Sequence, residues 1–127
     1  MNGDMLDTNV IIKYLGGDES AQRLIDSAID ISVSVIVMGE LQYGANKSTR
    51  KESNLILFAD FLSCFAVIHV DETIAAIYGE LKEQLRSKGI TIPENDIWIA
   101  ASAKARECRL LTFDAHFKHI DGLIVVS

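Results

Sequence analysis

Short segments with the character of β-strands alternate along this chain with longer segments of helical periodicity. The predicted strands are 5–6, 31–35, 67–70, 110–112 and 123–126. The predicted helices are 8–15, 19–28, 35–45, 50–64, 72–88 and 94–108, with a short helical turn from 114. Such alternation predicts an α/β fold, in which a mostly parallel central sheet has helices on both faces.

The size and composition are those of an ordinary globular protein. At 127 residues, with 49% hydrophobic and 24% charged residues, the chain is expected to form one domain, 1–127. No apolar run approaches the roughly 18 residues that a membrane span needs, and no basic segment precedes an apolar one at the N-terminus. We therefore expect a cytoplasmic protein with no membrane association. Cys64 and Cys108 fall within helical patterns and are expected to be reduced.

Four acidic residues stand at corresponding places in this pattern. Asp7 follows the first strand, Glu40 lies on the helix after the second, and Asp114 follows the fourth. Asp96 is in the first turn of the helix that leads into the fourth strand. In open α/β sheets ligands bind beyond the carboxyl ends of the strands, so we expect these four carboxylates to converge at one edge.

A simpler interpretation is available for three of the four. Asp7, Asp96 and Asp114 could each cap a helix, because aspartate is a favoured N-cap and suits the positive end of the helix dipole. Glu40 has no cap to serve, since it lies in the middle of an apolar helix face. Asp96 also shares its predicted face with apolar residues and should point inward. Because isolated buried carboxylates are costly, the set favours a shared cation.

Carboxylate oxygens select Mg²⁺, Mn²⁺ or Ca²⁺ over zinc. The three histidines do not have metal-ligand spacing, although His116 is near enough to Asp114 in sequence to contact a substrate. A metal held by four acids would lower the pKa of a water molecule for attack on phosphorus. Four neighbouring polar residues are candidates to support the carboxylates by hydrogen bonding: Thr8, Asn9, Asn95 and Thr112.

The net charge of −6 argues against a protein that coats nucleic acid by charge alone. It does not argue against a metal-dependent nuclease, because the four acids account for four of these six charges. Two basic clusters either contact a nucleic-acid backbone or form solvated helix faces. The first, nearer to Glu40 in sequence, is the candidate RNA-binding cluster Lys47, Arg50 and Lys51; the second is Lys82, Arg86 and Lys88.

Four motifs together resemble the PIN-domain ribonucleases, and among these the VapC toxins of prokaryotic toxin–antitoxin pairs. They are Leu-Asp-Thr-Asn at 6–9, Glu40 after the second strand, Pro-x-Asn-Asp-x-x-Ile-Ala-Ala at 93–101, and Leu-x-Thr-x-Asp-x-x-Phe at 110–117. The resemblance covers essentially the whole chain. It implies a three-layer α/β/α fold, Mg²⁺- or Mn²⁺-dependent cleavage of RNA, homodimerisation, and inhibition by a cognate VapB-type antitoxin.

The resemblance also implies roles for particular residues. The family's metal-binding acids correspond to Asp7, Glu40, Asp96 and Asp114, and Thr112 corresponds to a hydroxyl residue beside them. Two positions depart from the usual pattern. Gly3-Asp4 replaces apolar residues and is expected to shorten the first strand, and the family's last acid varies between Asn and Asp.

Two other functions fit part of the pattern. A haloacid-dehalogenase-like phosphatase also has an aspartate after its first strand, but it needs a second one two residues later, where this chain has Asn9. A degenerate PIN fold could serve as a protein-binding module without catalysis. The presence of all four acids favours the metal-dependent endoribonuclease.

Overall fold

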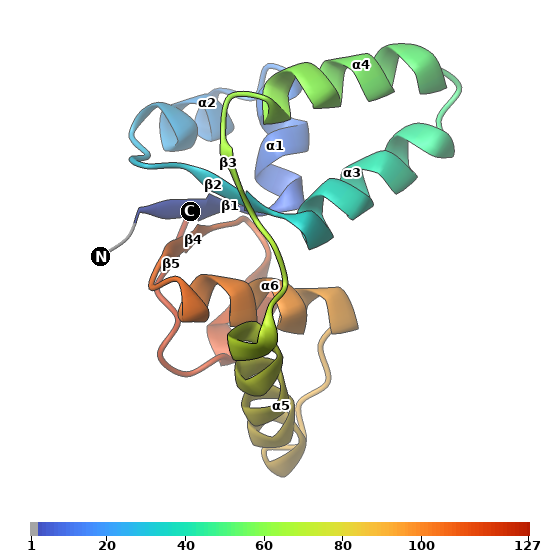
Figure 1. Cartoon of the computed structure of the whole chain (residues 1–127). Helices are drawn as coiled ribbons and strands as arrows, with labels where there is room; N and C mark the ends of the chain where they lie inside the picture. Colours follow the sequence, from blue (N-terminus) through green and yellow to red (C-terminus); the bar gives the residue numbers. More distant parts are fainter. Residues whose placement is uncertain (1–2) are drawn as a thin grey trace.

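The computed structural model describes residues 3–127 and contains one five-stranded sheet (Figure 1). The strand order is β3-β2-β1-β4-β5, and every pair is parallel. The strands are β1 (Asp4–Leu6), β2 (Ser32–Ser34), β3 (Ala66–Ile68), β4 (Arg109–Leu111) and β5 (Val125–Val126). The predicted parallel sheet is thereby confirmed.

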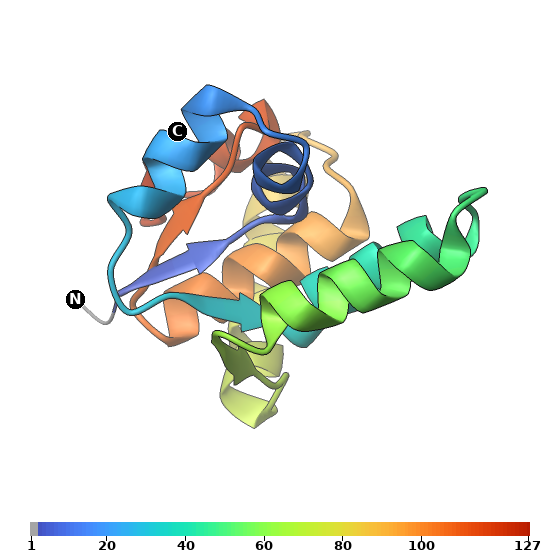
Figure 2. The same cartoon turned by 90° about the horizontal axis from the view of Figure 1, so that it is seen from above.

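Helices cover both faces of this sheet, as the α/β pattern predicted. The helices α1 to α4 lie on one side of it and α5 and α6 on the other (Figure 1). The α3–α4 pair also extends beyond the sheet as a hairpin (Figure 2). The helices are α1 (Thr8–Leu15), α2 (Glu19–Asp26), α3 (Val35–Asn46), α4 (Lys51–Leu62), α5 (Glu72–Ser87) and α6 (Glu94–Ala105), with the 3₁₀ helix η1 (Ala115–His119).

Local chemistry explains where several helices begin. The side chains of Asp18, Ser34 and Asp71 accept hydrogen bonds from backbone N–H groups in the first turns of α2, α3 and α5. Such caps satisfy donors that have no partner within the helix. The predicted cap at Asp71 is confirmed. Gly89, with φ of +70°, follows the end of α5 in the left-handed conformation that glycine adopts readily.

Some predicted boundaries are wrong by up to three residues. The helix predicted to run to Cys108 ends at Ala105, because Glu107 adopts φ of +54° and the backbone N–H of Cys108 bonds to the carbonyl of Ala103. Cys108 therefore lies outside the helix, and so does Cys64, which follows α4. Cys64 is an exposed free thiol, and Cys108 is buried.

The first strand begins one residue earlier than predicted, at Asp4. Asp4 begins β1, fully buried, and is paired in register with Arg109 on β4. The Arg109 guanidinium donates from Nε to Asp4 Oδ1 at 2.7 Å and from a terminal nitrogen to Oδ2 at 2.9 Å. The backbone N–H of Ile29 adds a third bond at 2.9 Å. A bidentate partner of opposite charge allows a carboxylate to occupy a buried strand position.

The core lies where the sheet meets the helices on its two faces. Met5 and Leu6 of β1 and Leu110 of β4 are fully buried. On α6, Ala100, Ala101 and Ala103 are likewise fully buried. Within residues 3–127, no helix has the length and apolarity needed to cross a membrane.

Candidate active site

The sheet grows outward from β1 in two directions: β2 and β3 are added on one side of it, and β4 and β5 on the other. At the carboxyl ends of β1 and β4, a cavity of about 220 Å³ is lined by all four predicted acids: Asp7, Glu40, Asp96 and Asp114. The helices that bring Glu40 and Asp96 to this place approach from opposite faces of the sheet. The site therefore occupies the switch point at which open α/β sheets bind ligands.

Asp7 lines the cavity and is only 4% exposed. One carboxylate oxygen accepts the backbone N–H of Thr8 at 2.8 Å, which caps α1. The other accepts the hydroxyl of Thr112 at 2.7 Å. Both interpretations of this residue are thus compatible: Asp7 caps a helix and also presents its carboxylate to the cavity.

Glu40 enters from α3, half-buried, and its carboxylate is held from two sides. The Thr8 hydroxyl donates to one oxygen at 2.6 Å, and the Asn95 amide donates to the other at 3.4 Å. These bonds join α1, α3 and α6, three helices that are distant in sequence. They fix the orientation of a carboxylate whose flexible side chain would otherwise sample several rotamers.

Asp96 and Asp114 meet at His116, a contact that sequence spacing did not predict. His116 Nδ1 lies 2.9 Å from Asp114 Oδ1 and 3.3 Å from Asp96 Oδ2. Asp96 is buried, with 8% exposure, and does not cap α6, since Pro93 occupies the cap position. Asp114 does cap η1, through a bond from the backbone N–H of His116 at 2.9 Å. The only sequence signal for this pairing is the i, i+2 spacing of Asp114 and His116.

The carboxylates repel one another. Burial is the main cause of the raised pKa of Asp7; the charges of Glu40 and Asp114 add to it, and hydrogen bonds from Thr112 and Thr8 oppose it. Burial, followed by the charges of Asp7 and Asp114, raises the pKa of Asp96 to about 6. In residues 3–127, none of the four acids is ion-paired with a lysine or arginine. The cluster is therefore short of positive charge.

The donor set suits a divalent cation. One ligand atom from each of Asp96, Asp114 and His116 can be chosen so that all three lie within 4.8 Å of one another. Asp7 and Glu40 line the same cavity. Carboxylates are the ligands that Mg²⁺ and Mn²⁺ take, and one imidazole is compatible with Mn²⁺. A cation here would supply the charge that the cluster lacks.

The remaining polar candidates have structural partners at the site. Asn9 accepts the backbone N–H of Phe113 at 3.1 Å, and its amide lies 3.4 Å from both Asp7 Oδ2 and Thr112 Oγ1. Thr112 Oγ1 also accepts the backbone N–H of Asp114 at 3.0 Å. Asn9, the second residue of α1, thus connects the start of this helix to the loop after β4. A phosphatase of the haloacid-dehalogenase type would need a second carboxylate where this amide lies.

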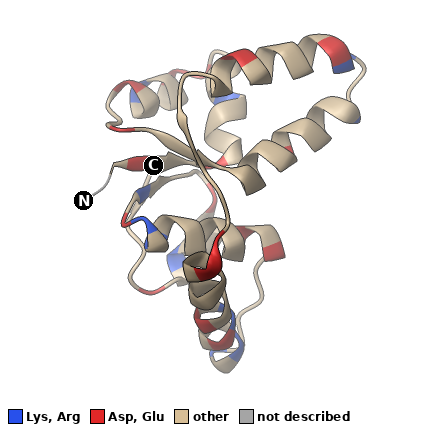
Figure 3. Ribbon diagram, in the orientation of Figure 1, with Lys and Arg blue, Asp and Glu red and all other residues tan. Residues whose placement is uncertain are grey.

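The candidate RNA-binding residues are only partly brought together. Lys47 lines a groove next to the acidic cavity. Arg50 lies in the turn before α4, and Lys51 is the first residue of that helix. That turn lies at the end of the hairpin remote from the sheet (Figure 2). Figure 3 shows both acidic and basic residues on α5, which carries Lys82 and Arg86 of the second cluster. Lys82 and Arg86 are ion-paired there with Glu94 and Glu83, as expected for a solvated face.

Comparison with known proteins identifies the family of this chain. The family model described as PIN domain matches residues 5–123. The chain belongs to the PIN-domain family. Ribonuclease VapC2 of Rickettsia felis is 36% identical in an alignment of 126 residues that covers 95% of this chain and 94% of the relative. Ribonuclease VapC2 of Haemophilus influenzae is 39% identical in an alignment of 125 residues that covers 97% of this chain and 83% of the relative.

A solved PIN-domain structure has the same architecture. The crystal structure of VapBC2 from Rickettsia felis, bound to a DNA fragment from its promoter, contains a chain that matches with a TM-score of 0.89 and 34% identity. The match covers 97% of this chain and 96% of that one. The predicted resemblance to VapC-type ribonucleases is confirmed, and this PIN domain is an enzyme of that class.

Proposed function

We propose that this PIN domain is the toxin of a toxin–antitoxin pair and hydrolyses RNA phosphodiester bonds with Mg²⁺ or Mn²⁺. The observation that carries the proposal is the convergence of Asp7, Glu40, Asp96 and Asp114 on one cavity at the switch point of the sheet. The raised pKa values of Asp7 and Asp96 support a cation as the missing charge, because within residues 3–127 no lysine or arginine is ion-paired with any of the four acids.

In this proposal the four carboxylates hold the cation, with His116 as a further donor. When bound, the cation supplies Lewis acidity, which activates water and neutralises charge on the phosphoryl oxygens. Thr112 and Thr8 hold the carboxylates of Asp7 and Glu40 in place by hydrogen bonding. Donors next to metal ligands commonly fix ligand orientation in this way. No serine or cysteine nucleophile is required.

A VapB-type antitoxin is the proposed protein partner, and a homodimer the proposed assembly. The similar solved structure from Rickettsia felis is that of VapBC2, which supports the first part. Exposed apolar side chains support a protein contact on the α3–α4 hairpin, because Ile56 and Leu57 of α4 are 64% and 43% exposed. A groove of about 360 Å³ between α3 and α4 is lined mainly by apolar residues, including Phe58 and Leu62.

The activity is tested with the free protein, because an antitoxin-bound toxin would be inactive. We expect cleavage of RNA in Mg²⁺ or Mn²⁺, none in excess EDTA, and recovery on adding back the metal. Asp7→Asn, which retains a cap for α1, should remove cleavage and leave the circular dichroism spectrum unchanged. Full activity in EDTA or in Asp7→Asn would contradict metal-dependent hydrolysis and favour the non-catalytic binding module.

The partner and target are tested together in cells. Induced expression, with and without the neighbouring upstream reading frame, is followed by sequencing of RNA 5′ ends. We expect new ends only when the toxin is expressed alone, and these ends identify the RNA target among transfer, ribosomal and messenger RNA. Identical ends in both cultures would exclude the upstream product as the antitoxin.

A further inference from the structure

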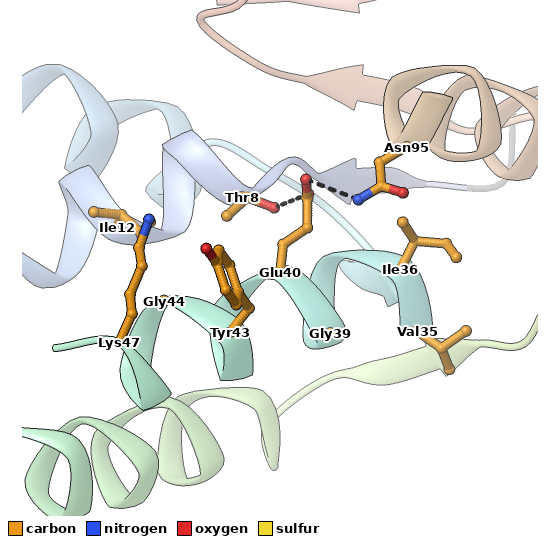
Figure 4. Close-up of a pocket in the computed structure, with 10 residues that line it drawn as sticks. All are labelled: Thr8, Ile12, Val35, Ile36, Gly39, Glu40, Tyr43, Gly44, Lys47 and Asn95. Atoms are coloured by element: carbon orange, nitrogen blue, oxygen red, sulfur yellow. Dashed lines mark hydrogen bonds between the residues drawn. The ribbon is translucent and has the colours of Figure 1, made fainter. Parts of the chain in front are cut away.

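A second cavity, of about 710 Å³, lies along α3 beside the acidic one. The two cavities share Thr8, Ile12 and Glu40, so they form one continuous depression. Figure 4 shows its lining: Glu40, Tyr43 and Lys47 follow one another along α3, with Ile12 of α1 on the facing side. The groove thus leads from the acids along one helix.

An aromatic ring and a cation lie along this groove. Tyr43 and Lys47 are three and seven residues after Glu40, which places them on the same helical face. Tyr43 is 66% exposed, and Lys47 Nζ lies 4.8 Å from the centre of its ring. Because the Tyr43 ring is so exposed, it contributes little to the hydrophobic core. The pair offers a stacking surface and a phosphate partner at adjacent places.

Two glycines of α3 also line the groove. Gly39 and Gly44 lie inside a helix, where glycine is less favourable than alanine by roughly 0.5–1 kcal/mol. A Cβ atom built at either position would meet nothing within 4 Å, so packing within residues 3–127 does not require glycine there. Gly79, inside α5, has equally open surroundings but lines none of the described cavities. The two α3 glycines therefore widen the groove at some cost in helix stability.

We propose that this groove binds the nucleotide next to the scissile phosphate of single-stranded RNA, with its base stacked on Tyr43 and its phosphate paired with Lys47. The proposal rests on the proposed ribonuclease function. Stacking on an aromatic side chain and pairing with a basic one is the general way in which proteins bind unpaired nucleic acid. Continuity with the acids favours RNA over a protein segment, because the polymer must pass from the groove into the reactive cavity.

The glycines provide the sharpest test. Gly44→Ala adds one methyl group to the groove without a clash, and Gly79→Ala is the matched control on α5. Both should raise the melting temperature by about 1–4 °C, since alanine favours the helix. Only Gly44→Ala should raise KM for a single-stranded RNA substrate, by at least about threefold, with little change in kcat. Equal KM values for the two variants would overturn the proposal.

Tyr43 provides a second, larger effect. Tyr43→Ala should raise KM by roughly 5- to 150-fold, the range measured when a base loses its stacking partner. Tyr43→Phe should restore the wild-type KM, because the ring remains. A KM for Tyr43→Ala equal to the wild-type value would also overturn the proposal. So would a change in oligomeric state or antitoxin binding without a change in KM, because the groove would then belong to a protein partner.

Binding measured without turnover separates this inference from the ribonuclease proposal. Fluorescence anisotropy of a labelled single-stranded RNA, in Ca²⁺ buffer, should show weaker binding by Tyr43→Ala and Gly44→Ala than by wild type and Gly79→Ala. Wild-type cleavage with unchanged binding in the variants would reject the groove alone. Weaker variant binding without any wild-type cleavage would reject the ribonuclease alone. Absence of wild-type binding and cleavage would reject both.

Discussion

Asp4 and Asp7 lie three residues apart at the two ends of β1, both buried, in opposite electrostatic surroundings. Burial acts to raise the pKa of Asp4, but the Arg109 guanidinium and the Ile29 N–H outweigh it, so that this pKa is lowered. Asp7 has hydrogen bonds but no cation, and its neighbours are other carboxylates, so its pKa is raised. The charge of Asp4 is balanced by Arg109 within the fold, whereas no cation of the fold balances that of Asp7 in the described residues.

Asp4, at the start of β1, therefore contributes to the stability of the fold, and Asp7, after its end, belongs to the candidate site. A buried charge with a complete set of partners stabilises the strands that it joins. A cluster of carboxylates without a cation destabilises the fold by mutual repulsion until a ligand of positive charge binds.

At the carboxyl end, Asp96→Asn should lower kcat/KM for RNA cleavage by ~1,000-fold or more, because several kcal/mol of stabilisation by the metal are lost. The same variant should melt at a higher temperature than wild type in metal-free buffer, since repulsion with Asp7 and Asp114 is relieved. Cleavage assays and thermal unfolding in EDTA measure the two effects. A lower melting temperature for this variant and for Asp7→Asn would contradict a shared acidic cluster.

At the amino end, Arg109→Met should reduce the free energy of unfolding by about 3 kcal/mol, because the fully buried Asp4 loses its partner. The double variant Asp4→Leu with Arg109→Met should recover most of this loss. Urea unfolding of the two variants and wild type gives the comparison. If Arg109→Met unfolds like wild type, the pair does not stabilise the fold.

The two ends should also respond oppositely to pH. Because the pKa of Asp96 is raised to about 6, the metal-free folded protein binds more protons there than the unfolded chain between about pH 4 and 6. The free energy of unfolding should therefore fall as pH rises through this window, by about 1–3 kcal/mol, and level off above it. Asp4 contributes stability that is complete above its ordinary pKa of 3.8 and is lost as pH falls through its lower folded value.

Thermal unfolding from pH 3 to 8 in EDTA, with wild type and Asp96→Asn compared, measures this response. The difference between the two curves isolates Asp96, since all other titrating groups remain. Parallel curves would show that Asp96 ionises normally in the folded protein.

The smallest effect is expected at the last acid. Asp114→Asn should lower kcat/KM for RNA cleavage by only about tenfold, because an amide oxygen can replace one of several donors and still cap η1. Its circular dichroism spectrum should match wild type, and its melting temperature in metal-free buffer should rise, since repulsion with Asp7 and Asp96 is relieved. A loss as large as that in Asp96→Asn would make Asp114 equivalent to the central ligands.

Much of the fold was predictable because it depends on local periodicity. Alternating strand-like and helical segments indicated a parallel sheet, and Asp71 and Gly89 marked the ends of α5 in sequence as they do in space. The carboxylate positions followed from the same pattern, since residues after parallel strands gather at one edge. The least predictable boundaries were those set by single residues such as Glu107, whose left-handed backbone ends α6.

The architecture, the edge at which the acids meet and the family of the chain all followed from the amino-acid sequence. Which buried charges are balanced by an opposite charge depended on the three-dimensional packing. Arg109 reaches Asp4 across 105 positions, and His116 reaches Asp96 across 20. Tyr43 became notable only when its ring proved to be exposed beside the acids. Electrostatic and stacking partners depend on distances in space, and these are set by the packing of strands and helices that the linear pattern does not specify.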